Sequence, residues 1–328
     1  MPVPARTVRF SMLMIFTSEN DKMADLTVNL GRLTVKNPVT TASGTFGYGK
    51  EYHDYYDISK LGSVTVKGIR MEVSDGNKMP RIAEVRSGML NAIGLQGPGA
   101  EHFLHDENYL PFLKKVGATV FVNIWGKTLE EYGEVAAMME TAKDDIAALE
   151  INISCPNVKE GGAAFGTDLK LAAAVVREVR KNTTIPLITK LSPNVTKITD
   201  FAKAAVDEGS DMLSLINTLG GMAIDIETHR PKLANVCGGL SGPAVKPVAI
   251  KMVYEVAKAV SVPIIGMGGI MNAEDAIEFM IAGASMVAIG TANFVDPYAA
   301  IKILDGINEY LDKHNIAKVS DIVGTVRL

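Results

Sequence analysis

Residues 263–292 read PIIGMGGIMNAEDAIEFMIAGASMVAIGTA, and this stretch predicts a strand, a helix and a second strand in that order. The apolar runs at 263–269 and 286–292 are almost continuous, which is typical of parallel strands buried on both faces. The segment 273–282 between them is amphipathic, and Asn272 with Asp275 three residues later signals its helical start. The stretch therefore predicts one βαβ unit of a parallel sheet.

Six further apolar runs of the same kind come earlier in the chain. They are PVTTAS (38–43), SVTVKG (63–68), VFVNIWG (120–126), ALEINIS (148–154), PLITKLSP (186–193) and MLSLINT (212–218). Amphipathic segments follow at 129–141, 169–181, 199–208 and 245–260, and Thr128 and Thr167 signal two of the helix starts. Eight strands with helical crossovers predict an α/β fold, the (β/α)8 or TIM barrel. An open doubly wound sheet remains the alternative, because the strand count alone does not exclude it.

Polar or glycine residues stand at the carboxyl end of every predicted strand. They are Ser43 with Gly44, Lys67 with Gly68, Asn123, Asn152, Lys190, Asn217 with Thr218, Gly268 with Gly269, and Gly290 with Thr291. One such residue is typical of an ordinary loop, but eight occurrences at one edge of an apolar sheet favour a functional site. In a barrel, this edge carries the active site.

Composition and charge argue against several classes of function. The 328 residues carry a net charge of −4 and no basic stripe, which argues against a nucleic-acid partner. The two cysteines, Cys155 and Cys237, cannot form a disulfide framework or hold an iron–sulfur cluster alone, and an intracellular setting is the default. Residues 1–22 contain an apolar run too short to span a bilayer. We expect these residues to be either a disordered extension or a segment upstream of the true start of the protein. A single barrel domain is expected over 23–328.

The last two strands carry the clearest ligand signal. GMGG (266–269) precedes a capped helix, and GTA (290–292) ends the final strand. Glycine turns let backbone N–H groups approach a phosphate, and barrels often bind phosphate after strands seven and eight. No GxGxxG opens a βαβ unit, and no metal-ligand spacing is present, so neither a Rossmann-type NAD site nor a metal is indicated. The turns favour a phosphorylated cofactor or substrate over a purely structural role.

A thiol follows the fourth predicted strand, in EINISCPN (150–157). A buried structural thiol is the ordinary interpretation of a cysteine. The position of Cys155 beyond a barrel strand, three residues after Asn152, favours instead a general base, because a free thiol has a pKa near ~8.5. Asparagines at the same edge can recognise a neutral heterocyclic amide ring. Lysines there can stabilise negative charge that develops on a cofactor ring or a substrate carboxylate.

With these residues in place, the sequence resembles the dihydroorotate dehydrogenases of class 1, B type, the FMN-containing catalytic subunits of the NAD-dependent two-subunit enzymes. The resemblance runs from about residue 26 to the C-terminus. Its motifs are NPVTTASGTFGYG (37–49), SVTVKGI (63–69), MLNAIGLQGPG (89–99), EINISCPNVKEGGAAFGTD (150–168), KLSPNV (190–195), INTLGG (216–221), GGLSGPAVKP (238–247), GMGGI (266–270) and IGTA (289–292).

The resemblance implies a role for each matching residue. Cys155 is expected to be the catalytic base. FMN is expected to contact Ser43, Lys67, Gly68, Asn123, Asn152, Lys190, Ile216, Gly242, Gly268, Gly269, Gly290 and Thr291. Substrate is expected to contact Lys67, Asn91, Ala92, Ile93, Gly94, Leu95, Asn152, Asn217 and Thr218. The segment 70–110, an insertion between strands two and three, is expected to cover the substrate.

The resemblance also implies a reaction and partners. Dihydroorotate is oxidised to orotate in pyrimidine biosynthesis, the cysteine taking the C5 proton while hydride passes to FMN. A partner subunit with FAD and a [2Fe–2S] cluster would pass the electrons to NAD+, in a cytoplasmic heterotetramer built on a homodimer of this chain. A fumarate-dependent single-subunit enzyme, a dihydropyrimidine dehydrogenase and a non-catalytic phosphate-binding barrel stay as alternatives.

Overall fold

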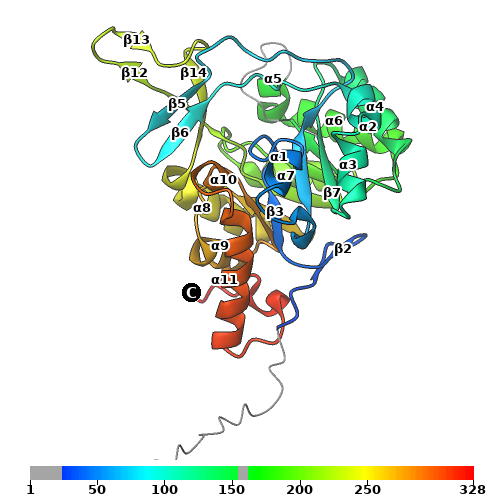
Figure 1. The fold of residues 1–328 in the computed structure, drawn as a ribbon, viewed down its shortest axis with the longest axis vertical. Coiled ribbons are helices and arrows are strands. Elements are labelled where there is room, and N and C mark those ends of the chain that lie inside the picture. Colours follow the sequence, from blue (N-terminus) through cyan, green and yellow to red (C-terminus); the bar gives the residue numbers. More distant parts are fainter. Residues whose placement is uncertain (1–23, 154–161) are drawn as a thin grey trace, which may run out of the picture.

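The computed structural model describes residues 24–153 and 162–328 and has eight parallel strands at its centre (Figure 1). These strands are β3 (Val39–Thr41), β4 (Val64–Ile69), β7 (Val120–Ile124), β8 (Ala148–Asn152), β9 (Leu187–Lys190), β10 (Met212–Leu215), β15 (Ile264–Met267) and β16 (Met286–Ile289). Each lies within one of the eight predicted runs, or within one residue of it. Neighbours in the sheet follow chain order, β3 through β10 and then β15 and β16, and β16 pairs with β3.

Hydroxyl side chains join β3 to β4, where the sheet order begins and ends. Thr41 donates its hydroxyl to the Thr65 carbonyl at 3.2 Å and accepts the Thr65 N–H at 3.0 Å. Ser63 donates to the Thr40 hydroxyl at 2.7 Å. All four residues are buried, so these bonds form away from water and bring the two end strands together. The predicted (β/α)8 barrel is confirmed, and the open doubly wound sheet is wrong.

Helices connect successive strands and cover the outside of the barrel (Figure 1). The longer ones are α4 (Leu129–Glu140), α6 (Leu169–Asn182), α7 (Ile198–Asp207), α8 (Lys246–Ala257), α9 (Ala273–Ala282) and α11 (Ala299–Lys313). The shorter ones are α1 (Lys50–His53), α2 (Ala100–His105), α3 (Leu110–Lys115), α5 (Gly162–Thr167) and α10 (Ala292–Val295).

Two of the three predicted helix caps are confirmed and one is wrong. The Thr128 side chain accepts the Glu131 N–H at 3.2 Å, and Asn272 accepts the Asp275 N–H at 2.9 Å. Thr167 does not cap α6, because it is the last residue of α5. Asp168 takes that position, and its carboxylate accepts the Leu171 N–H at 2.9 Å. Both residue types are good caps, so the sequence alone did not decide between neighbours.

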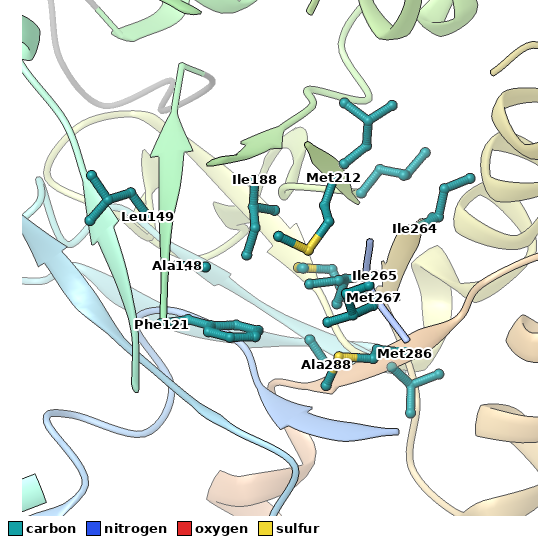
Figure 2. Close-up of a cluster of buried hydrophobic side chains, with 14 of the residues drawn as sticks. Phe121, Ala148, Leu149, Ile188, Met212, Ile264, Ile265, Met267, Met286 and Ala288 are labelled. Atoms are coloured by element: carbon teal, nitrogen blue, oxygen red, sulfur yellow. The ribbon is translucent and has the colours of Figure 1, made fainter. Parts of the chain in front are cut away.

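An apolar layer of side chains fills the part of the barrel interior that is farther from the carboxyl ends of the strands. Phe121, Ile188, Met212, Ile265 and Met286 come from five different strands, and their side chains converge in Figure 2. All five are at most 2% exposed. Because side chains on a strand alternate between faces, the residue two positions further along each strand also points inward, one layer closer to the carboxyl edge. The apolar layer therefore supports the next layer of inward-pointing side chains, which lies closer to the carboxyl edge.

A second, antiparallel sheet lies beyond the carboxyl edge of the barrel (Figure 1). Its strands, in spatial order, are β11 (Leu219–Met222), β14 (Cys237–Ser241), β6 (Gly88–Asn91) and β5 (Ile82–Val85). The insertion predicted between strands two and three supplies β5 and β6. The other half comes from an excursion between β10 and β15, which the sequence analysis did not anticipate. That excursion also contains β12 (Ile224–Asp225) and β13 (Arg230–Pro231).

The remaining strands are β1 (Val28–Asn29) and β2 (Thr34–Val35), which form a small antiparallel pair before the barrel. Within residues 24–153 and 162–328, no helix is long and apolar enough to cross a membrane.

Candidate active site

A pocket opens between the carboxyl edge of the barrel and the antiparallel sheet. Lys67, Asn152 and Lys190 line it from the barrel, and Met89 and Leu240 line it from the sheet. The pocket and its open mouth contain about 1260 Å³ that no protein atom occupies. Its lining combines apolar side chains with a few polar groups, which is typical of a ligand-binding site.

Most of the residues predicted to bind cofactor or substrate line this pocket. They are Ser43, Lys67, Gly68, Asn91, Ile93, Gly94, Leu95, Asn152, Lys190, Ile216, Asn217, Thr218, Gly242, Gly268, Gly269, Gly290 and Thr291. They come from the ends of the barrel strands and from the two excursions, so the fold brings distant segments to one cavity.

Two predicted residues lie outside the pocket lining, and the position of a third is not described. Ala92 is fully buried and packs with Leu90 and Leu233 on the other side of the covering sheet, because it alternates with the pocket-facing Asn91. Asn123 is also fully buried and lies behind Gly68, outside the pocket wall. Cys155, the expected base, is outside the described residues.

The pocket also contains residues that the sequence analysis did not single out. They are Ala42, Thr45, Ile82, Met89, Leu240, Ser241, Val245, Met267, Ile270, Met271, Ala288 and Phe294. Most are apolar and stand in or beside strands, where the sequence gives the same signal as a core residue. Ser241 had a local cue, since it lies in GGLSG (238–242), directly before a predicted glycine.

Glycine is required at one end of the pocket. Gly269 has a φ of +84°, and a Cβ there would stand 2.8 Å from the Gly242 carbonyl oxygen and 2.9 Å from Lys246 Cβ. The chain can therefore turn here only without a side chain. The Thr291 hydroxyl donates to the Ser241 hydroxyl at 2.8 Å, which joins the turn after β16 to the end of β14. Bare backbone with neighbouring hydroxyls is a favourable lining for a phosphate.

Lys246 borders this end of the pocket and is held by two acidic side chains of α9. Its ammonium lies 2.6 Å from Asp275 Oδ1 and 2.7 Å from Glu278 Oε2. Hydrogen bonds to Asp275 and Glu278 raise the pKa of Lys246. Because two carboxylates neutralise this ammonium, Lys246 joins α8 to α9 beside the glycine turn and adds no net positive charge there.

Four polar side chains form the layer directly above the apolar layer of the barrel. Glu150 accepts hydrogen bonds from Asn123 Nδ2 at 2.6 Å and from Ser214 Oγ at 2.7 Å, and the Lys190 ammonium lies 3.4 Å from it. These residues lie on β7, β8, β9 and β10, four neighbouring strands. The side chains of Glu150 and Lys190 are only 3% and 6% exposed. A buried charge needs such partners, and here they hold a lysine at the pocket floor.

Two asparagines meet beside Lys190, because Asn152 is its register partner across β8 and β9. Asn217 Nδ2 donates to Asn152 Oδ1 at 3.2 Å, and the Asn217 oxygen accepts the Thr218 N–H at 2.8 Å. Amide side chains both donate and accept, so this pair can match the ring N–H and C=O groups of a small heterocycle.

The wall around Gly68 is tightly packed. A Cβ at Gly68 would lie 2.9 Å from Asn123 Oδ1 and 3.1 Å from Trp125 Cδ1. Trp125 is 3% exposed, and the Arg70 guanidinium lies 5.3 Å from its ring centroid. The only tryptophan therefore packs behind the wall and does not enter the pocket. Glycine at position 68 lets the backbone itself form the wall.

Comparison with known proteins identifies the family. The family model described as dihydroorotate dehydrogenase matches residues 25–311. The chain belongs to the dihydroorotate dehydrogenase family. It is 55% identical over 304 residues to a protein of Desulforamulus reducens, which covers 93% of this chain and 99% of that relative. A protein of Citrifermentans bemidjiense is 56% identical over 304 residues, with the same coverage.

A relative from Bacteroides thetaiotaomicron is 53% identical over 306 residues, covering 93% of this chain and all of that relative. All three relatives are named dihydroorotate dehydrogenase B (NAD(+)), catalytic subunit. The dihydroorotate dehydrogenases are flavin-dependent oxidoreductases that act on a CH–CH bond.

The pocket fits a flavin nucleotide. It has a bare glycine turn for a phosphate at one end, a lysine at the floor and a flat backbone wall at Gly68. The buried oxygen of Asn123, behind that wall, has no hydrogen-bond partner among the described residues. This acceptor lies against the backbone of Gly68, so Asn123 supports the pocket wall without lining the pocket.

Proposed function

We propose that this dihydroorotate dehydrogenase binds FMN in the pocket, oxidises dihydroorotate to orotate in pyrimidine biosynthesis, and passes electrons through a second subunit to NAD+. The observation that carries the proposal is the joining of three parts in one cavity. These parts are the glycine turn at Gly269, the buried lysine Lys190 and the amide pair Asn152–Asn217.

The cofactor would lie between the glycine turns and the lysine floor. The turns at Gly242, Gly269 and Thr291 would hold its phosphate, and Gly68 would lie against its ring. When bound, FMN supplies the acceptor for the hydride that leaves C6 of dihydroorotate. Lys190 would stabilise negative charge at the pyrimidine edge of the ring, because a buried cation acts strongly where water is excluded.

The substrate would lie under the covering sheet. Asn152 and Asn217 would pair with its ring amides, with Asn91 and Thr218 beside them, and Lys67 would pair with its carboxylate. These contacts fix the ring in one orientation, which lowers the entropic cost of reaction. The segment 93–95 closes the same side and limits access of water to the reacting carbons.

Cys155 is our proposed base. The proposal rests on sequence, since Cys155 comes three residues after the pocket residue Asn152, the last residue of β8, and matches the cysteine of the family motif. The thiolate would remove the proton from C5 of dihydroorotate, which leaves the C5–C6 double bond of orotate when hydride departs from C6. A thiol base predicts a rate that rises with pH toward the pKa of the thiol.

The partner proposal rests on the relatives' names. They are called catalytic subunits of an NAD(+) enzyme, which implies a second subunit. We propose that FAD and a [2Fe–2S] cluster belong to that subunit, and that a homodimer of this chain forms the core of a cytoplasmic heterotetramer.

One anaerobic experiment tests the proposed function. The purified chain, reconstituted with FMN, should lose its visible flavin absorbance when dihydroorotate is added without oxygen. Dihydrouracil should not bleach the flavin, and fumarate should not reoxidise it efficiently. Efficient turnover with NAD+ should require the partner subunit. Absence of bound flavin, or a flavin that dihydroorotate leaves oxidised, contradicts the proposal.

A further inference from the structure

Glu150 is a buried charged residue to which the proposed mechanism gives no role. It lies two residues before Asn152 on β8 and is 2% exposed. It does not line the pocket, yet it contacts side chains from three other barrel strands, β7, β9 and β10. Burying a carboxylate is costly, so a position that holds one in a barrel core needs a physical reason.

The first consequence of Glu150 is the orientation of Asn123. A carboxylate can only accept hydrogen bonds, so the atom of Asn123 that lies 2.6 Å from Glu150 Oε2 must be the amide nitrogen. The amide oxygen is thereby turned away from Glu150. It faces Gly68, where a Cβ would stand only 2.9 Å from it, and Gly68 is part of the pocket wall.

The oriented oxygen has no donor in the protein. Asn123 Oδ1 is buried and makes no hydrogen bond with any residue in the described ranges. If the amide flipped, two N–H donors would face the wall and its oxygen would face the Glu150 carboxylate, which is repulsive. Glu150 thus turns a buried acceptor toward the backbone of Gly68, so the position of this part of the pocket wall depends on Glu150.

The second consequence concerns Lys190. Its ammonium lies 3.4 Å from the same Oε2 atom that accepts from Asn123, while Ser214 donates to the other oxygen, Oε1. One carboxylate therefore links the floor lysine to the wall asparagine. The register places Asn123 beside Glu150 and Ser214 beside Lys190. The bonds from Asn123 and Lys190 join β8 to its two neighbours, and the bond from Ser214 reaches β8 from β10, past β9.

We propose that Glu150 is a positioning residue for the flavin site, which fixes the acceptor orientation of Asn123 and the place of Lys190 beneath the pocket. The inference deepens the proposed function and rests on it, because the ligand whose binding is affected is FMN. Glu150 does not touch the cofactor. It acts through the two side chains that it holds.

Titration of apoprotein with FMN, read by quenching of flavin fluorescence, tests the inference without turnover. Glu150→Gln keeps the shape of the side chain but can donate as well as accept, so Asn123 loses its enforced orientation. The Kd of this variant for FMN should rise about tenfold, because the wall at Gly68 loses the fixed support of Asn123. Asn123→Ala should also weaken binding. In the double variant, Glu150→Gln should add less than about a twofold further loss.

The non-additive pattern separates positioning from general destabilisation. A purely structural role for Glu150 predicts that the two losses multiply in the double variant. The inference is overturned if the two losses of FMN affinity multiply in the double variant. It is also overturned if the Kd of Glu150→Gln is within twofold of the wild-type value. The matched control is Glu255→Gln, the same charge change on the outer helix α8, where Glu255 pairs only with Lys251 at 3.0 Å among the described residues. Its Kd for FMN should match that of the wild type.

A second pair of variants covers the case in which Glu150→Gln does not fold. Removing one partner of a buried ion pair leaves an uncompensated charge, whereas removing both does not. Glu150→Gln with Lys190→Gln is then compared with the triple variant that also carries Asn123→Ala. Both variants lack the ion pair, and Asn123 is already released in the double variant, so their Kd values for FMN should agree within about twofold. A triple variant that binds FMN about tenfold more weakly than the double variant overturns the inference.

The outcome also distinguishes the inference from the proposed function. If the wild-type chain binds FMN but dihydroorotate does not bleach it, the proposed function fails, while the Kd values still decide the role of Glu150. If the flavin bleaches normally and the Kd values show no coupling, only the role of Glu150 fails. If the wild type binds no FMN, both are overturned.

Discussion

The Tyr132 hydroxyl, on helix α4, donates a hydrogen bond to the backbone carbonyl of Asn152 at 2.8 Å. Tyr132 is 1% exposed, and Asn152 is the last residue of β8. An outer helix thereby fixes the end of the strand that carries a pocket asparagine. The bond links packing outside the barrel to the geometry of the site.

Tyr132→Phe should lower the free energy of unfolding by about 1–3 kcal/mol, because the Asn152 carbonyl loses a buried donor. The affinity for orotate should also fall, because the strand end can move. Urea unfolding measures the first effect and orotate titration the second. Tyr310→Phe on the outer helix α11 is the control, and it should leave the orotate affinity unchanged. Equal orotate affinities for Tyr132→Phe and wild type would contradict the prediction.

Gly269→Ala should greatly weaken FMN binding. The φ of +84° is unfavourable for alanine, and the added Cβ would lie 2.8 Å from the Gly242 carbonyl oxygen. The cost of strain is roughly 1–2 kcal/mol, and displacement of the turn adds a loss of phosphate contacts. Fluorescence titration with FMN measures the result, which should be a rise in Kd of more than about tenfold.

Gly117→Ala is the matched control for this variant. Gly117 has a similar φ of +72°, but a Cβ added there would have no other described atom within 4 Å. The substitution should therefore cost stability through strain alone and leave the affinity for FMN unchanged. Equal loss of FMN binding in both variants would show that strain, and not the pocket turn, determines the effect.

Lys190→Gln should slow the reduction of bound FMN by dihydroorotate and lower the flavin midpoint potential. The variant removes the buried cation that would stabilise negative charge on the reduced ring. Loss of one preorganised electrostatic contact commonly costs about 10²–10³ in rate. Anaerobic stopped-flow absorbance gives the rate, and a reference-dye titration gives the potential. Lys251→Gln on α8 is the control, and an unchanged potential in Lys190→Gln would refute this role.

Cys155→Ala should retain FMN but lose most of its reduction by dihydroorotate. In the wild type, the reduction rate should rise with pH toward the pKa of a free thiol, near ~8.5, because the thiolate is the base. The alanine variant should lose that pH dependence. Cys237→Ala serves as control, since Cys237 is exposed at the start of β14 and does not line the pocket. Wild-type reduction kinetics in Cys155→Ala would remove this residue from the mechanism.

Glu140 makes stability depend on pH far from the pocket. Burial opposes the ionised form, but hydrogen bonds from Thr183 and Thr184 prevail and lower the pKa of Glu140 from 4.5 to about 2. Because the pKa of Glu140 is lower in the folded protein than in the unfolded chain, ionised Glu140 stabilises the fold at pH values above the pKa of the unfolded chain. This contribution is complete above about pH 4.5 and is lost as the pH falls toward 2.

Glu140→Gln should therefore be less stable than the wild type at pH 7 by about 1–2 kcal/mol, and the difference should shrink as the pH falls from 4.5 toward 2. Urea unfolding at a series of pH values measures this difference. Glu309→Gln, an exposed position on α11, should show no such convergence. A stability gap that stays constant down to low pH would contradict the assignment.

The barrel could be predicted because its signal is local. A short continuous apolar run indicates each of the eight strands, and amphipathic spacing indicates the helices between the later strands. Chain order then equals spatial order, so the runs needed no long-range information to be arranged. The cap at Asp168 was missed because Thr167 is an equally good local candidate.

The covering sheet could not be predicted in the same way. Its strands β6 and β14 are about 150 positions apart, and they pair antiparallel with Asn91 opposite Gly239. Only the first half, within 70–110, was expected as a cover. The pairing depends on contacts that form after the barrel has brought both excursions to one edge. Met89 and Leu240 therefore reached the pocket without any cue in the sequence.

The sequence by itself determined the strand count and the edge that carries the site, because strand periodicity and strand ends are local properties. The resemblance to the family implied the further pocket residues at 91, 93–95, 216 and 242. The tertiary structure decided which side chains support one another. Glu150 reads in the sequence as part of a strand, and its role follows only from the donors Asn123, Lys190 and Ser214 on three other strands. A buried carboxylate is defined by its partners, and those partners become neighbours only when the barrel closes.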